Sequence, residues 1–196
     1  MDNTMNNTTE DRRVQKTKKA LRKSLSVLLA KKNIQAITVK ELTNLADVHR
    51  GTFYFHYKDV YDLQEQIENE ILEEIKGIFD AHPPDENHDK VLSMLTVFNQ
   101  YLYKNAEICH LFINGNGNYN FCDKLRMMIK DEYLHKWIEN LSKKSSGEDL
   151  EYFCDFIMAG YIAVVGRWLA GRMQITPEEL TLKMQHMALE GIGFLN

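Results

Sequence analysis

The ten residues from 50 to 59, RGTFYFHYKD, combine four aromatic rings with guanidinium, hydroxyl, imidazole and ammonium groups. Such polar groups donate hydrogen bonds to anions and to the edges of heterocycles, while aromatic rings cover flat apolar surfaces. A core segment rarely carries so many donors, and a solvated surface segment rarely carries so many rings. The stretch therefore predicts a binding surface.

A short helix through this stretch would turn part of it inward. Phe53 and Tyr57 lie four residues apart, so they share one helix face and are predicted to pack against the rest of the domain. Arg50 stands at the start of the helix, where a guanidinium can donate two hydrogen bonds to guanine O6 and N7. Gly51 has no side chain, which lets the backbone come close to a sugar-phosphate chain.

The remaining side chains suit contacts with a nucleic-acid backbone. Thr52, Tyr54 and His56 offer hydroxyl or ring N–H donors to phosphate oxygens, and Lys58 adds a positive charge at the start of the next helix. Phe55 has two interpretations, because its ring suits either a thymine methyl or a sugar. The stretch thus has the composition of a recognition helix for the major groove of DNA.

The preceding residues predict the first helix of a helix-turn-helix unit. In ITVKELTNLADV, Thr38 and Glu41 have the spacing of a capping box, so a helix is predicted over 39–46. Leu42 and Leu45 are predicted to face inward. The tight turn DVHRG follows, and two short helices joined in this way match a helix-turn-helix unit.

The net charge of −4 hides an asymmetry between the two parts of the chain. Residues 1–58 contain 12 Lys and Arg against 5 Asp and Glu, a net of +7, whereas the remainder contains 12 against 23, a net of −11. A basic head on an acidic body indicates that only the head meets a polyanion. The first predicted helix also carries a row of cations, which is either a solvated face or a surface near DNA: Arg13, Lys16, Lys19, Arg22 and Lys23.

Helical periodicity continues through the rest of the sequence, with no convincing strand alternation. The sequence predicts an all-α fold of about nine helices, of which those in the body cover 59–82, 89–104, 106–113, 120–142, 149–173 and 178–194. Thr176, Pro177 and Glu179 predict a capped start for the last of these helices.

The segment ITVKELTNLADVHRGTFYFHYKDVYDL resembles the DNA-binding segment of the TetR family of bacterial transcriptional regulators. The run of Thr, aromatic, Tyr, any residue, His, aromatic and Lys carries this resemblance. It implies an all-helical homodimer in which three N-terminal helices bind DNA and a fourth helix links them to a ligand-responsive body. The last two helices would form a four-helix dimer interface. We therefore expect a DNA-binding domain over 1–58, ordered from about residue 10, and a regulatory and dimerisation domain over 59–196.

Two positions depart from the family pattern. His49 stands where a small capping residue is usual, so the cap of the recognition helix is expected to be weaker or sensitive to pH. Val60 stands where a lysine is common, so one phosphate contact is expected to be missing. The other matching positions imply phosphate contacts by Thr38, Tyr54 and His56, base proximity of Arg50, Gly51 and Thr52, and a basic start of the linking helix at Lys58.

The body resembles a branch of the family from Gram-positive bacteria. The segments ICHLFINGNGNYNFCDKL and MAGYIAVVGRWLAGRMQITPEELTLKM carry this likeness. The branch includes coactivators of dihydroxyacetone kinase operons, which act through a partner protein. Membership of this branch does not settle the effector.

The last two predicted helices carry small and apolar residues that favour close approach of a partner helix. These residues are Ala159, Ala163, Gly166, Ala170, Leu180, Met184, Met187 and Gly191. A second interpretation places a ligand pocket at Tyr161, Arg167 and Trp168. Arg167 has alternatives of its own: an ion pair with Glu178 or Glu190, or an anionic ligand.

No pattern in the sequence predicts an enzyme, a metal site or a cofactor, because no nucleophile, base and orienter assemble. Three cysteines without a CxxC motif favour a reducing compartment. The polar first residues do not resemble a signal peptide, and the apolar run FIMAGYIAVVG stops at Arg167, short of the roughly 20 residues of a membrane span. A cytoplasmic protein without a membrane segment is expected.

The sequence thus predicts a homodimeric DNA-binding regulator, a repressor that recognises an inverted-repeat operator and is released by an unknown small-molecule effector. The alternative is a transcriptional coactivator, an interaction module that works through a partner protein.

Overall fold

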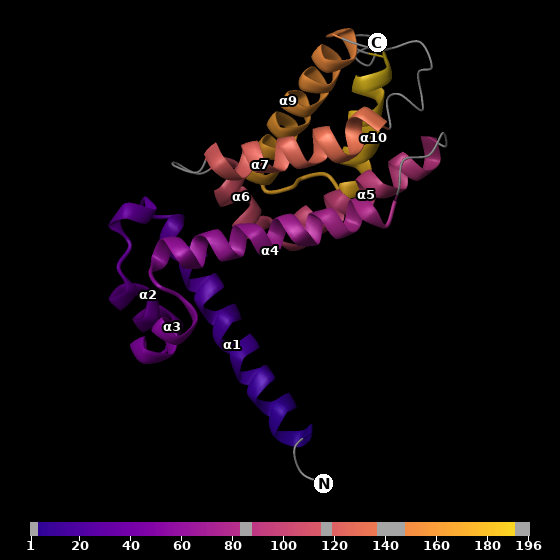
Figure 1. The fold of residues 1–196 in the computed structure, drawn as a ribbon. Coiled ribbons are helices and arrows are strands. Elements are labelled where there is room, and N and C mark those ends of the chain that lie inside the picture. The colour runs from indigo at the N-terminus through magenta and orange to yellow at the C-terminus, as the bar shows by residue number, and fades with distance from the viewer. Residues whose placement is uncertain (1–3, 83–87, 115–118, 137–147, 191–196) are drawn as a thin grey trace. The chain divides into compact units, whose positions relative to one another are not determined.

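The computed structural model describes residues 4–82, 88–114, 119–136 and 148–190 of the 196-residue chain, and nearly all of them are helical (Figure 1). They form nine α-helices, one 3-10 turn and one π-helical turn, with no strand within these ranges. The prediction of an all-α fold is confirmed. The chain divides into two compact units, of which the first reaches Glu70 and the second begins at Ile71. This division falls inside one helix, α4, Val60–Asp80.

The first unit contains one long helix and two short ones. In chain order its elements are α1, Thr4–Leu29; η1, Ile34–Ala36; α2, Val39–Ala46; α3, Arg50–His56; and the start of α4. Helix α1 packs against α2, and α2 packs against α3. The core includes side chains with 0 % exposed surface: Leu21, Leu25, Leu42, Phe53 and Leu63. Because a helix as short as α3 is not stable alone in water, this packing must hold its shape.

Helix α2 shows the threonine half of the predicted capping box, while the carboxylate of Glu41 accepts a hydrogen bond from Nζ of Lys32 at 2.5 Å. The helix starts after Thr38, whose hydroxyl accepts a hydrogen bond from the backbone N–H of Glu41 at 3.3 Å. Leu42 is buried as predicted, but Leu45 is 50 % exposed, so the prediction that it faces inward is wrong. Thr43 occupies the inward face instead, because its hydroxyl donates to the carbonyl of Val39 at 2.8 Å and needs no water.

The second unit contains the remaining helices. These are α5, His88–Lys104; α6, Ala106–Asn114; α7, Tyr119–Ile129; the π-helical turn η2, Lys130–Leu134; α9, Glu148–Ala170; and α10, Pro177–Glu190. Helix α5 packs against α10, α6 packs against α7 and α9, and η2 packs against α9. Figure 1 shows α5, α6, α7, α9 and α10 grouped into one helical body.

The predicted body helices agree with the structure apart from their ends. The helix predicted over 149–173 stops at Ala170, because Arg172 and Met173 adopt left-handed φ angles of 59° and 50°. The last helix starts as predicted, since Thr176 and Glu179 exchange two backbone-to-side-chain hydrogen bonds at 2.8 and 3.2 Å. Parts of the helices predicted over 120–142 and 178–194 lie outside the described residues.

A carboxylate pair fixes the start of α4. The backbone N–H of Asp62 donates to Asp59 at 2.8 Å, and the carboxylate of Asp62 accepts from the backbone N–H of Lys58 at 2.8 Å. The hydrogen bond from Lys58, followed by one from Gln66, lowers the pKa of Asp62 below 3.8.

Burial, with the nearby charges of Glu70 and Asp62, raises the pKa of the Tyr57 phenol to about 12.

The lowered pKa of Asp62 predicts a loss of stability in acid. A carboxyl group with a depressed folded-state pKa contributes stability above its unfolded pKa of 3.8, and this stability disappears as the pH falls through the folded value. We expect Asp62→Asn to lower the free energy of unfolding at neutral pH by about 1 kcal/mol. The difference from the wild type should shrink below about pH 4 in urea titrations. Asp59→Asn is the control, because asparagine still caps a helix; a deficit for Asp62→Asn that is independent of pH would contradict the prediction.

Candidate nucleic-acid interface

Helix α3 is capped by a histidine. Nδ1 of His49 accepts a hydrogen bond from the backbone N–H of Gly51 at 3.1 Å. A ring nitrogen accepts only when it carries no proton, so this cap requires the tautomer with its proton on Nε2. A Cβ at Gly51 would lie 3.2 Å from the same Nδ1, so the glycine also gives the histidine ring room to cap.

The two rings predicted to pack inward are buried. Phe53 has 0 % and Tyr57 has 4 % of its surface exposed, and their ring centroids are 5.5 Å apart. Tyr54 and Phe55 point outward, with 59 % and 82 % exposed. The remaining predicted contacts are also accessible: Thr38, Arg50, Gly51, Thr52 and Lys58 are exposed, and His56 is half-buried.

The row of cations predicted on α1 is mostly accessible. Arg13, Lys16, Lys19 and Lys23 are exposed, whereas Arg22 is half-buried. The first unit therefore presents both the polar side chains of α3 and several cations of α1 to solvent.

The small residues of α9 do not all lie on one exposed face. Ala159, Ala163 and Ala170 are exposed, whereas Gly166 is buried against α6. A Cβ at Gly166 would lie 2.7 Å from Oδ1 of Asn114, and Nδ2 of Asn114 donates to the Gly166 carbonyl at 2.9 Å. The prediction that Gly166 faces a partner subunit is corrected, because its missing side chain makes room for a helix of the same unit.

Helix α10 needs a similar correction. Leu180 is 2 % exposed, so it belongs to the core of the body and not to a surface for a partner. Met184 is half-buried and Met187 is 40 % exposed. Gly191 lies outside the described residues.

Sequence reasoning missed three exposed rings at the start of α9. Tyr152 is 65 %, Phe153 is 43 % and Phe156 is 71 % exposed. Phe156 lies three residues before Ala159 and seven before Ala163, so these residues share one stripe along the helix. The cluster of rings in EYFCDF was a signal for this surface in the sequence.

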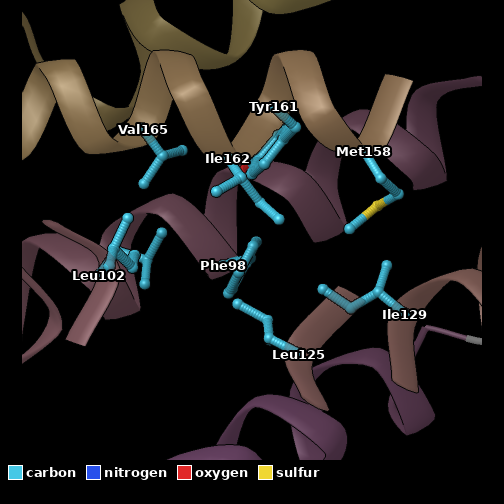
Figure 2. A pocket seen from close by; sticks show the side chains of 9 residues that line it. Phe98, Leu102, Leu125, Ile129, Met158, Tyr161, Ile162 and Val165 are labelled. Atoms are coloured by element: carbon cyan, nitrogen blue, oxygen red, sulfur yellow. The ribbon is translucent and has the colours of Figure 1, made fainter. Parts of the chain in front are cut away.

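An apolar cavity lies among the body helices (Figure 2). The volume open to the centre of a water molecule is about 10 Å³, so the cavity has room for roughly one water. Figure 2 shows side chains of α5, α7 and α9 converging on this space. The lining residues are Phe98, Leu102, Ile113, Leu125, Ile129, Met158, Tyr161, Ile162 and Val165.

Only one of the three predicted ligand-binding residues lines this cavity. Tyr161 does, whereas Trp168 is 7 % exposed and donates its ring N–H to the carbonyl of Ile175 at 2.9 Å. Arg167 is exposed. Glu178, one of its two predicted partners, instead accepts a hydrogen bond from a glutamine of α5 at 2.7 Å. The structure therefore does not bring the predicted trio to one cavity.

A buried polar chain that the sequence analysis missed runs beside the cavity. The hydroxyl of Tyr161 donates to Oδ1 of Asn99 at 2.7 Å, and Nδ2 of Asn99 donates to the hydroxyl of Thr181 at 2.9 Å. Burial raises the pKa of the Tyr161 phenol above its ordinary value. Asn99 stands between Leu95 and Leu102 in the helical repeat of α5, which was the available signal for a polar residue facing the core.

Within the described residues, no group of three or more His, Cys, Asp and Glu could hold a metal ion. Helix α9 is long and apolar enough to cross a bilayer by length and composition alone, with a mean hydropathy of 1.4. It also packs against α6 and η2 and buries Cys154, Met158 and Leu169, while 33 % of its apolar stretch is buried.

Comparison with known proteins places the body in a described family. Residues 89–190 match a TetR C-terminal family described as "Transcriptional regulator C-terminal region". The match spans just over half of the chain and covers most of the body from α5 to α10. A Bacillus subtilis protein, the uncharacterized HTH-type transcriptional regulator YxbF, is 29 % identical over 128 residues. That alignment covers 64 % of this chain and 34 % of the relative, so the chain matches about a third of the length of that protein.

Solved structures share the fold. A fatty acid degradation regulator FadR from Bacillus halodurans aligns with a TM-score of 0.68 at 15 % identity, over 90 % of this chain and 96 % of the other. A TetR transcriptional regulator from Streptococcus agalactiae aligns with a TM-score of 0.63 at 22 % identity, over 92 % and 98 %. The dihydroxyacetone kinase operon activator DhaS aligns with a TM-score of 0.57 at 20 % identity, over 90 % and 96 %. With the body matched in sequence and the helical fold shared, the chain belongs to the TetR family, whose members are transcriptional regulators and not enzymes.

Proposed function

We propose that the chain is a cytoplasmic, homodimeric repressor that binds DNA through α3 and is released by a small-molecule effector. The observation that carries the DNA-binding part is the division of α3 into two faces. Phe53 and Tyr57 anchor it in the first unit, while the side chains suited to base edges and phosphates remain in solvent. A helix that exposes such groups beside a basic α1 fits the major groove of duplex DNA.

The side chains of α3 and its surroundings would divide their roles by position. Arg50 would donate to guanine O6 and N7, and Gly51 would let the helix backbone approach the groove. Tyr54, with its ring 59 % exposed, and the half-buried His56 would donate to phosphate oxygens. Thr52 would lie close to the bases beside Arg50 and Gly51, and Thr38 and Lys58 would hold the flanking backbone.

A homodimer would place two copies of α3 in successive major grooves, so the operator would be an inverted repeat. The surfaces that support dimerisation are the exposed stripe of α9 and the exposed apolar residues of α10. Phe156, Ala159 and Ala163 supply the stripe of α9, and Leu182 and Met187, 52 % and 40 % exposed, supply α10. Packing such stripes in pairs forms a four-helix bundle that removes the rings from water.

The effector is proposed to enter the apolar cavity of Figure 2. Because that cavity has room for about one water, an effector must displace side chains such as Ile129 and Met158 in order to bind. Helix α4 carries residues of both units, so a displacement of its end in the body would change the spacing of the two heads. The effector would act by binding one head spacing better than the other.

The exposed rings at the start of α9 favour a second candidate function, that of a coactivator working through a partner protein. A body with Tyr152, Phe153 and Phe156 exposed to solvent is suited to recruiting another protein. The fold shared with the dihydroxyacetone kinase operon activator is consistent with this alternative.

DNA titrations against the chain's own upstream region, at several salt concentrations, test the main proposal. Arg50→Ala should reduce the preference for the operator over random duplex by about 5- to 150-fold, because a bidentate base contact contributes about 1–3 kcal/mol of discrimination. Lys58→Ala should weaken all duplexes alike and lower the salt slope by about 0.9 per subunit. Lys104→Ala is the matched control, because Lys104 is an exposed cation of the acidic body. It should change neither the preference for the operator nor the salt slope. Binding of the wild type no tighter than to random duplex would count against the proposal.

Sedimentation over a range of concentrations tests the dimer. Phe156→Glu should weaken self-association by at least about tenfold, since it puts a charge where an apolar ring meets its symmetry mate. Met127→Glu changes an equally exposed apolar residue, 63 % exposed on α7, and should leave the dimer intact. Equal effects of the two substitutions, or a wild type that stays monomeric, would argue against this interface.

A pull-down with and without operator DNA separates the repressor from the coactivator. For an effector-controlled repressor, the purified protein should bind its operator alone and need no second protein. For a coactivator, operator binding should depend on a protein captured from the cell extract. Tyr152→Ser should then abolish the capture and leave the wild-type affinity of the purified protein for duplex DNA unchanged. If purified protein binds its operator at full strength and captures no protein, the coactivator alternative is excluded.

A further inference from the structure

Phe55 is the most exposed large apolar side chain among the residues that the structure describes, with 82 % of its surface in solvent. The burial of neighbouring Phe53 shows that the first unit can enclose a phenyl ring of this helix. An apolar ring that stays in water does not gain the favourable free energy of burial. Its exposed position therefore suggests that the ring packs against an apolar surface of a binding partner.

Helical geometry places Phe55 on the outermost ridge of α3. Successive side chains on a helix are rotated by roughly 100°, so residues two positions from the inward-facing Phe53 point to the opposite side. Gly51 and Phe55 are those residues, and they form one ridge because they lie four positions apart. Arg50 and Tyr54 flank the ridge on one side, and the other flank consists of Thr52 and His56.

If α3 lies in the major groove with its two flanks toward the groove walls, this ridge reaches deepest toward the base pairs. The floor of the major groove presents hydrogen-bonding edges and one apolar group, the C5-methyl of thymine. Gly51 offers no side chain to the floor, which allows the ridge a close approach. The ring of Phe55 is set against His56, with centroids 5.0 Å apart and planes at 85°, so a neighbouring ring supports its orientation.

From this placement we infer that Phe55 is a specificity-determining residue that reads one thymine methyl in each half-site of the operator. The inference rests on the proposed function, in which α3 occupies the major groove. Packing of the ring on a sugar is the competing arrangement, and it would give affinity without sequence preference.

The test uses duplexes that the full-length protein selects from a random pool. Each thymine of the selected sequence is replaced by deoxyuridine, which removes one methyl and keeps every hydrogen bond. At one thymine per half-site, the wild type should bind about 4-fold more weakly after replacement, the effect expected for one methyl group leaving an apolar contact. In Phe55→Ala, the ratio of the affinity for the thymine duplex to the affinity for the deoxyuridine duplex should fall to about 1 at that position. Phe55→Leu, which keeps an apolar side chain, should retain part of the preference.

The outcomes separate the inference from the proposed function. If a sequence is selected but every deoxyuridine ratio is the same in the wild type and in Phe55→Ala, the ring does not read a methyl and the inference is overturned. If no sequence is enriched over random duplex, the proposed function fails and the inference fails with it. Because Phe55 is 82 % exposed, its removal should leave the thermal unfolding of the unit unchanged, and a loss of stability would also contradict the inference.

Discussion

Burial of the Phe53 ring decides which side chains α3 presents to solvent. The helix has only seven residues, too few to form by itself, so its position depends on what it packs against. Phe53 has no exposed surface and touches the ring of Tyr57, and removing a buried ring of this size typically costs about 3–5 kcal/mol. With that ring fixed inward, the helical repeat leaves Gly51 and Phe55 on the opposite ridge. The set of side chains that α3 exposes is therefore a consequence of core packing.

In the body, the π-helical turn η2 joins the end of α4 to α9 through two lysines. Lys76 of α4 binds Glu132 and Tyr133 of η2, and hydrogen bonds to these partners raise its pKa above the ordinary value. From η2, Lys130 pairs with Asp155 and Glu151 of α9 at 2.6 and 2.9 Å, and these partners raise its pKa as well. Both ammonium groups thus stay charged through the neutral range. These ion pairs connect η2, a turn that carries an extra residue, to both α4 and α9.

Features that depend on a few neighbouring residues could be predicted from the sequence. The caps at Thr38 and Thr176 are examples, because a hydroxyl at the N-cap position of a helix can accept from the backbone N–H three residues later in almost any fold. The sequence-based predictions were wrong where the burial of a residue depends on which helix, distant in the sequence, packs against it. The small and apolar residues of α9 and α10, such as Gly166 and Leu180, suit a helix of the same chain or of another. Only the structure shows that α6 and the body core use these two positions.

The buried chain through Asn99 restricts the kind of molecule that the body can admit. Its amide is already bonded to Tyr161 and Thr181, so a polar effector that enters must replace a satisfied hydrogen bond with one of equal quality. Since burial raises the pKa of the Tyr161 phenol, the hydroxyl stays neutral and offers no charge to a cationic ligand. The rest of the lining is hydrocarbon and sulfur. An apolar molecule would therefore fit this interior better than a polar one, because it could leave the polar chain intact.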